Sequence, residues 1–124
     1  MNENVVILGA SDSVERYSYK AFKLLKEHSH NVFLVSPKNL VIEKEKIYST
    51  LDEVTNTKIQ IDTLTIYVNP KISTNLTDSI IKLHPGRVIF NPGTENAELE
   101  KSLAENNISF ERACTLVLLN TNQY

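Results

Sequence analysis

The amino-acid sequence predicts a single α/β domain of the doubly wound type, with a five-stranded, mainly parallel sheet. Short apolar runs alternate with amphipathic segments along the chain, as parallel strands alternate with crossover helices. The length of 124 residues suits one domain with its own hydrophobic core. No internal repeat, low-complexity tract or linker divides the chain, so we expect residues 1–124 to fold as one unit.

The chain begins with a predicted strand, helix and second strand. Residues 5–8 form a continuous apolar run that stops at Gly9, as expected for a strand buried on both faces. Residues 17–29 place apolar side chains at helical spacing, with lysines on the opposite side. A second apolar run, 32–35, ends just before Pro37, which has no N–H to donate to a sheet. These three elements predict a βαβ unit with parallel strands.

The middle of the chain is charged and irregular. Residues 39–59 are interpreted as a connector that holds one short helix near residues 51–54. Alternation of strands and helices resumes after it. The further expected elements are a strand at 63–68, a helix at 73–83, a strand at 87–90, a helix at 95–106 and a short edge strand at 108–110. The closing apolar segment, 113–119, is not assigned to either type.

The charge balance excludes several classes of partner. Thirteen Lys and Arg against fifteen Asp and Glu give a net charge of −2. Such a chain has no general positive field to attract nucleic acid or an anionic membrane, and neither is expected as a partner. An anionic ligand must therefore be bound by local groups.

Cysteine and histidine usage argues against a metal site. Cys114 is the only cysteine, so it forms no intramolecular disulfide and no Cys-x-x-Cys pair. His28, His30 and His84 are too scattered for a metal-binding tract. The N-terminal residues lack the basic and apolar regions of a signal peptide, and no apolar run is long enough to span a bilayer. We therefore expect a cytoplasmic protein without a metal.

Small, polar and proline residues follow the four main predicted strands. They occur in the segments 9–13, 36–38, 69–71 and 91–95. The carboxyl ends of parallel strands share one edge of the sheet, where ligands bind in open α/β folds. Such residues also simply terminate strands, which is the alternative interpretation of any one of these loops.

The segment after the first strand carries the most chemistry. Gly9 permits a tight turn, but Ser11 and Val14 stand where a dinucleotide fingerprint has its second and third glycines, which disfavours a plain NAD site. The predicted helix then begins near Arg16 and Ser18. Free amides at a helix start bind phosphate, and an arginine can donate two hydrogen bonds to it. A solvated arginine beside packed tyrosines is the alternative.

The end of the second strand discriminates between nucleotides. An NAD site has a carboxylate there to bind the ribose hydroxyls, whereas this chain has Ser36 and Lys38. A hydroxyl and a cation suit a ribose that itself carries a phosphate, as in NADP or coenzyme A (CoA). The alternative for Lys38 is an exposed lysine in a connector.

These segments together resemble those of a known family. Residues 9–11, 15–21, 35–38, 69–70, 90–96 and 111–114 are similar to the stand-alone CoA-binding proteins, and the likeness covers nearly the whole chain. Their domain is similar to the nucleotide-binding domain of the succinyl-CoA synthetase α subunit. The resemblance implies a Rossmann-like fold with sheet order 3-2-1-4-5 and CoA across the carboxyl edge. The chain departs from many relatives in its Asn-Pro-Gly segment and in the residues after Cys114.

The resemblance also implies which residues bind the parts of CoA. The pyrophosphate would lie among Gly9, Ala10, Ser11, Arg16, Tyr17 and Ser18, with Asp12 in the same loop. The phosphorylated ribose would lie at Ser36 and Lys38, and the adenine near Val68, Asn69 and Pro70. The pantetheine arm would lie toward Asn91, Pro92, Gly93 and Cys114.

Three functions remain open on the sequence. The first is non-catalytic binding of CoA or an acyl-CoA, and we identify no catalytic residue. The second is a small NADP-dependent reductase, for which Tyr48 and Tyr67 are only generic proton donors. The third is a regulatory or interaction domain without an essential ligand. The expected partner is a small nucleotide, with a homodimer compatible with any of the three. Cys114 either exchanges with the CoA thiol or is buried and inert.

Overall fold

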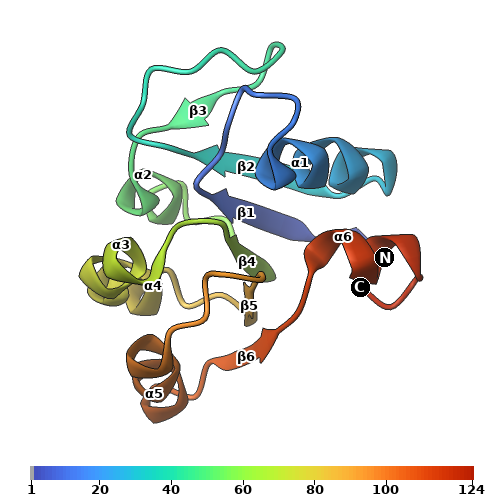
Figure 1. Cartoon of the computed structure of the whole chain (residues 1–124). Helices are drawn as coiled ribbons and strands as arrows, with labels where there is room; N and C mark the ends of the chain where they lie inside the picture. The colour runs from blue at the N-terminus through green and yellow to red at the C-terminus, as the bar shows by residue number, and fades with distance from the viewer. Residues whose placement is uncertain (1) are drawn as a thin grey trace.

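The computed structural model of the protein describes residues 2–124, and in them six strands form one parallel sheet between two layers of helices (Figure 1). The α/β class is thereby confirmed. The strands are β1 (Asn4–Leu8), β2 (Asn31–Val35), β3 (Ile47–Tyr48), β4 (Thr63–Ile66), β5 (Arg87–Phe90) and β6 (Ser109–Arg112). The helices are α1 (Tyr17–Glu27), α2 (Leu51–Thr55), α3 (Pro70–Asn75), α4 (Thr77–Leu83), α5 (Ala97–Glu105) and α6 (Thr115–Asn120).

The two faces of the sheet have separate hydrophobic cores. Val5 and Ile7 of β1 face the layer of α1 and α6, which contact each other. Val6 and Leu8 face the layer of α2, α4 and α5. All four of these side chains are buried, which explains why β1 is a continuous apolar run rather than an alternating one.

The sheet has six strands, and the prediction of five was wrong. The added strand is β3, a two-residue segment in which Ile47 pairs with Leu34 and Tyr48 with Val35. The amide of Ser36 extends this pairing by donating to the Tyr48 carbonyl at 2.9 Å. Two residues within a charged connector are too few to show strand periodicity, so only the neighbouring strand reveals them.

The strand order follows from this correction. It is β3-β2-β1-β4-β5-β6, and every neighbouring pair is parallel. The segment counted third in the sequence is β4, which pairs with β1 instead of lying outside β2. Strand β1 is therefore central, with its carboxyl end between those of β2 and β4.

Capping side chains set several helix boundaries. The side chain of Asn69 accepts a hydrogen bond from the Ile72 amide, so α3 begins directly after the β4 segment, with Pro70 in its first turn. The single helix expected at 73–83 is thus two helices, joined at Leu76. Asn96 caps α5 in the same way, and the unassigned closing segment forms α6.

Candidate functional site

The segments after β1 and β2 are bonded together at the carboxyl edge. The amides of Gly9 and Ala10 both donate to the Val35 carbonyl, each at 3.0 Å. Ser36 comes next in the chain and is buried, and its hydroxyl accepts from the Lys38 amide at 3.2 Å. This local turn holds Lys38 close to the first loop, as the sequence predicted from the parallel pairing of the strands.

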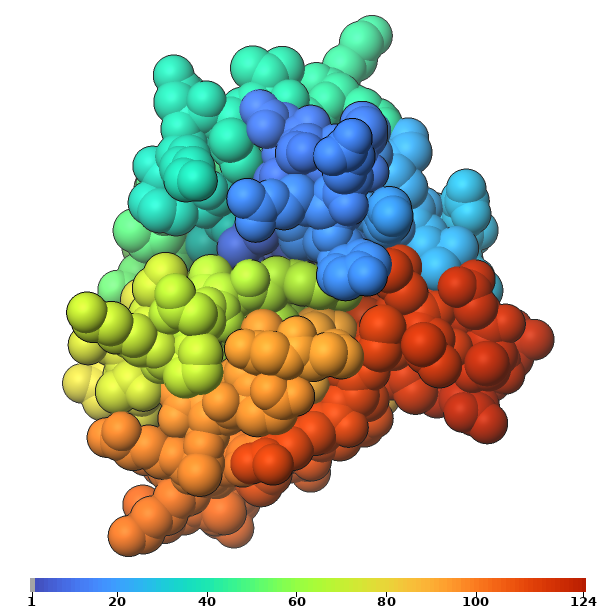
Figure 2. Space-filling view, viewed as in Figure 1, coloured from blue at the N-terminus to red at the C-terminus, as the bar shows by residue number. Residues whose placement is uncertain are grey.

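The same edge continues across β4, β5 and β6. The Tyr67 amide donates to the Leu8 carbonyl at 2.9 Å, and the Ala113 amide donates to the Phe90 carbonyl at 3.1 Å. In the face shown in Figure 2, the segments after β1 (blue), β4 (yellow-green), β5 (orange) and β6 (red) meet around a common centre. All four loops singled out in the sequence therefore lie on one edge of the sheet.

Gly9 is required by close contact as well as by conformation. Its φ angle is +96°, which disfavours any residue with a Cβ atom. A Cβ there would lie 2.9 Å from Val68 Cγ1 and 3.2 Å from the Tyr67 carbonyl carbon. The first loop thus passes tightly over the end of β4, which brings residues 9–16 beside the 67–70 segment.

The start of α1 presents unpaired backbone amides. Among residues 2–124 no acceptor is found for the amides of Tyr17, Ser18 and Tyr19, and no side chain caps the helix. By contrast, side chains cap α2, α3 and α5. The first turn of α1 holds no acidic residue, so no side chain within that turn opposes an anion at the positive end of this 11-residue helix.

Arg16 and Lys38 lie in the loops of this edge without a carboxylate partner. Both are exposed, and neither forms an ion pair with any residue from 2 to 124. Lys71, in the first turn of α3 after β4, is likewise exposed and unpaired within that range. Unpaired cations and free helix amides at one edge can attract an anion to a chain with a net negative charge.

Asn91 has a different role from the one expected for it. The side chain is buried, and its amide nitrogen donates to Thr65 Oγ1 at 2.6 Å and to the Ile66 carbonyl at 2.9 Å. Its Oδ1 accepts from the Thr115 amide at 2.9 Å. Asn91 therefore ties β5 to β4 and to the start of α6. Its side chain has both polar atoms engaged within the protein.

The remaining predicted residues also lie on the carboxyl edge, with differing exposure. Ala10 and Ser18 are buried, while Ser11 is half-buried and accepts from the Ser13 amide at 3.0 Å. The exposed residues are Asp12, Tyr17, Asn69, Pro92 and Gly93, and those of intermediate exposure are Gly9, Val68, Pro70 and Cys114. Cys114 directly precedes α6.

Sequence reasoning missed the hydroxyl groups buried beneath the carboxyl edge. Thr65 and Thr115 are fully buried, and their hydroxyls form a hydrogen bond of 2.8 Å. Tyr67 stands beside them at the end of β4. The signal available in the sequence was the presence of polar threonines within the otherwise apolar β4 run. They were read only as residues that favour a strand.

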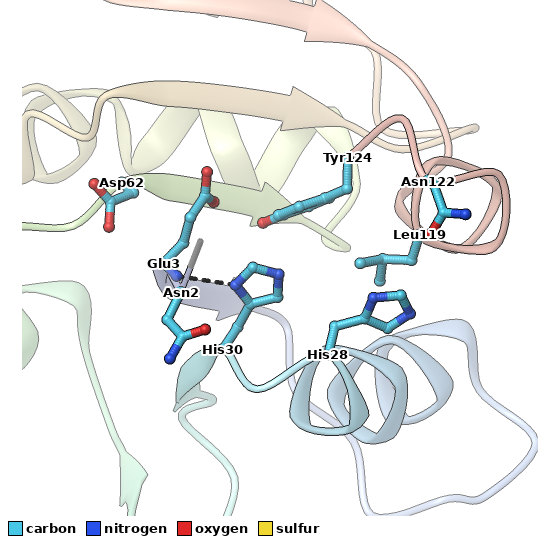
Figure 3. Close-up of a pocket in the computed structure, with 8 residues that line it drawn as sticks. All are labelled: Asn2, Glu3, His28, His30, Asp62, Leu119, Asn122 and Tyr124. Carbon is cyan, nitrogen blue, oxygen red and sulfur yellow. Dashed lines mark hydrogen bonds between the residues drawn. The ribbon is translucent and has the colours of Figure 1, made fainter.

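A separate pocket lies at the opposite, amino edge of the sheet (Figure 3). Its volume is about 400 Å³, and the aromatic and histidine side chains that line it include His28, His30 and Tyr124. The ring of Tyr124 packs 5.2 Å from that of His30, and the His30 Nδ1 accepts the Glu3 amide at 2.9 Å. This pocket contains none of the predicted binding residues.

The comparison with protein families decides the affiliation. The family described as "CoA binding domain" matches residues 3–120, nearly the whole chain. The protein belongs to the CoA binding domain family. The likeness stated from the sequence is thereby confirmed for the family.

Solved structures support the same fold for this CoA binding domain. One, titled as an uncharacterized protein, is 38% identical with a TM-score of 0.91, covering 100% of this chain and 99% of its own. A hypothetical protein from Pyrococcus horikoshii OT3 is 25% identical, with a TM-score of 0.86 and coverages of 97% and 83%. A Thermus thermophilus protein is 21% identical, with a TM-score of 0.85 and coverages of 99% and 91%, which shows the fold alone. No curated protein matches the chain.

Across residues 2–124 of this CoA binding domain, His, Cys, Asp and Glu side chains nowhere gather in threes as a metal site would need. In the same range, no helix has the length and apolar character needed to cross a membrane.

The contact beneath Gly9 predicts a difference between two glycine substitutions. We expect Gly9→Ala to lower the free energy of unfolding by roughly 1–3 kcal/mol, because it adds both a strained φ and a clash with the β4 segment. Gly93 has a φ of +89° but nothing within 4 Å of its would-be Cβ, so Gly93→Ala should cost less. Urea denaturation measures both. Equal losses would show that the contact with β4 is not the constraint.

His30 predicts how stability depends on pH. Burial lowers the pKa of His30, and the Glu3 carboxylate opposes this shift. A histidine with a lower pKa in the folded chain costs nothing above its unfolded pKa of about 6.5, and destabilises the fold progressively as the pH falls below it. We expect the free energy of unfolding to decrease from about pH 7 to pH 5, and His30→Asn to reduce that slope.

His84, which is exposed and lies outside this pocket, provides the control. His84→Asn should keep the wild-type slope in the same urea titrations. A His30→Asn slope equal to the wild type would remove His30 as the source of the pH dependence.

Proposed function

We propose that this CoA binding domain binds CoA or an acyl-CoA along the carboxyl edge of its sheet, without catalysing a reaction on it. The observation that carries the proposal is the uncapped start of α1 next to two unpaired cations, in a chain that belongs to the CoA binding domain family. CoA carries its phosphates in two places, and the edge offers two anion-binding places.

The first place suits the pyrophosphate. The amides of Tyr17 and Ser18 point along the axis of α1, and Arg16 stands at its entrance. A helix start with free amides stabilises a phosphate through both hydrogen bonds and the helix dipole. The arginine adds a planar donor that can bind two oxygens at once.

The second place suits the phosphate on the ribose. Lys38 lies three residues past β2, in the turn whose amide bonds to the buried Ser36 hydroxyl. The Val35 carbonyl accepts from both Gly9 and Ala10, so hydrogen bonds join the loop before α1 to the end of β2. The two proposed phosphate sites lie on these two joined segments. In CoA, one ribose likewise connects the pyrophosphate to the terminal phosphate.

The other parts of CoA follow from the order of the strands. The adenine is assigned to the side of Val68, Asn69 and Pro70, beyond the β4 end. The pantetheine arm then runs across β5 toward Pro92, Gly93 and Cys114. Asn91 contributes here by holding the start of α6, since its side-chain atoms are already bonded within the protein.

A binding role without catalysis agrees with the chemistry of the side chains. Burial raises the pKa of Tyr67 to about 12, against the smaller opposing effect of the Thr115 and Thr65 hydroxyls, so the phenol is a poor acid near neutral pH. Cys114 has no histidine within its segment to act as a base. An NADP-dependent reductase would need a proton donor matched to its working pH.

Native mass spectrometry of the freshly purified protein tests the ligand class. We expect the protein to carry, or to take up on addition, one CoA or acyl-CoA per chain. Uptake of NADP in preference to CoA would support the reductase. Absence of any bound nucleotide, with no thermal shift from CoA or NADP, would favour a regulatory or interaction domain.

Lys38 predicts a selective loss of affinity. Lys38→Ala should weaken CoA binding by about 1.5 to 3 kcal/mol, on the order of ten- to a hundredfold, because a charged hydrogen bond to the ribose phosphate is lost. Dephospho-CoA lacks that phosphate and should be little affected. Isothermal titration calorimetry with the two ligands makes the comparison.

Two further variants complete this test. Arg16→Ala should weaken CoA and dephospho-CoA alike, because both contain the pyrophosphate. Lys58→Ala removes an exposed cation that precedes the amino end of β4, and should change neither affinity. Equal weakening of both ligands by Lys38→Ala would contradict the assignment of the ribose phosphate.

A further inference from the structure

Three hydroxyl groups gather under the carboxyl edge, and one of them lacks a partner. Thr65 and Thr115 bond each other at 2.8 Å, and Thr65 also accepts from Asn91 at 2.6 Å. The hydroxyl of Tyr67 lies beside these two threonines and is buried, but forms no hydrogen bond with any described residue. A buried hydroxyl without a hydrogen-bond partner costs free energy. A ligand group that bonded to the Tyr67 hydroxyl would remove that cost.

The geometry leaves the hydrogen of the Tyr67 hydroxyl without an acceptor. The acceptor atom of Asn91 is already used by the Thr115 amide. The two threonine hydroxyls bond each other, and neither forms a hydrogen bond with the Tyr67 hydroxyl, although a hydroxyl oxygen can accept two. A ligand group that accepts a hydrogen bond would therefore satisfy the Tyr67 hydroxyl.

The surroundings indicate a neutral acceptor. The ring of Tyr67 packs against the apolar cluster that includes Ala10, together with Leu116 of α6. The buried polar groups nearest to it are threonines and Asn91, which carry no charge. An anion would be poorly stabilised there, whereas a carbonyl oxygen needs one donor and tolerates apolar neighbours.

Tyr67 also lies on the path assigned to the ligand. Its amide bonds to the Leu8 carbonyl, its backbone is in contact range of Gly9, and Val68 follows it. Cys114, which is half-buried, directly precedes Thr115, whose hydroxyl lies beside Tyr67. The Tyr67 hydroxyl has no hydrogen bond to break. The ring can therefore turn toward a bound ligand without loss of a polar contact.

We propose that the Tyr67 hydroxyl donates a hydrogen bond to a carbonyl oxygen of the pantetheine and acyl arm of the bound CoA derivative. This inference rests on the proposed function. It adds a residue that the sequence did not place among the CoA-binding residues, and a reason for the arm to lie toward Thr115 at the start of α6. Burial keeps the phenol protonated, so it acts as a donor throughout the neutral range.

The test is the variant Tyr67→Phe with three ligands, measured by isothermal titration calorimetry. The ligands are CoA, acetyl-CoA and 3′-phosphoadenosine 5′-diphosphate, which keeps all the phosphates and the adenine but lacks the arm. We expect CoA, acetyl-CoA or both to bind about two- to tenfold more weakly, as for one lost neutral hydrogen bond. The armless nucleotide should bind unchanged.

Tyr124→Phe is the matched control. Its hydroxyl is likewise buried without a partner, but at the opposite edge of the sheet. It should leave the affinity for all three ligands unchanged. The melting temperature of ligand-free Tyr67→Phe should not fall, because the substitution removes an unsatisfied buried hydroxyl and leaves the ring in place.

The outcomes separate this inference from the proposed function. A loss confined to acetyl-CoA places the bond at the thioester carbonyl, and an equal loss for CoA and acetyl-CoA places it at an amide of the arm. Unchanged affinity for both, or an equal loss for the armless nucleotide, overturns the role of Tyr67 while CoA binding stands. Failure of the wild-type protein to bind any of the three overturns the proposed function itself.

Discussion

The passage of the first loop across the end of the sheet is the constraint on which the rest of the carboxyl edge depends. Gly9 adopts a φ of +96° directly against the β4 segment, and the two amides at Gly9 and Ala10 share the Val35 carbonyl. These contacts place the first loop between the ends of β2 and β4, so that α1 begins at the carboxyl edge. A residue with a larger side chain at this turn would move the helix start away from the neighbouring loops.

The two edges of the sheet are held together by different kinds of interaction. At the amino edge, Arg87 donates to Thr63 at 2.9 Å and pairs with Glu111 at 3.4 Å, and its guanidinium lies 4.5 Å from the Tyr124 ring centre. At the carboxyl edge, the links among β1, β4 and β5 are neutral bonds of backbone, threonine and asparagine groups, and an ion pair of Arg112 with Glu100 lies at the end of β6. Arg16 and Lys38 form no ion pair with residues 2–124, so their charge can attract an anion.

The sequence was informative where one element carries its own signal. The first strand, helix and second strand were predicted well because the apolar runs are continuous and are followed by Gly9 and Pro37. The loops of the site were found because parallel strands end at one edge. Strand β3 was missed because its two residues depend on pairing with β2, and the split between α3 and α4 because a cap outweighed a periodic pattern.

The site itself shows the same limit. Residue type and position placed Arg16, Ser36 and Lys38 at the carboxyl edge, where they present exposed or local groups. They could not show that Asn91 turns inward, since this depends on acceptors supplied by β4 and α6. Nor could they show that Tyr67 lacks a partner, because hydrogen-bond satisfaction is a property of the assembled core. Such features are visible only when distant segments are brought together.

Strand β6 ends the sheet on one side, and its four residues are all exposed. An uncovered border of this kind can recruit other extended chains and start aggregation. Two of its residues carry charge, and both form ion pairs. Arg112 donates two hydrogen bonds to Glu100, at 2.8 and 2.9 Å, and Glu111 pairs with Arg87. Fixed charges on so short an edge strand make edge-to-edge pairing with another chain unfavourable. This edge is therefore protected against aggregation at high protein concentration.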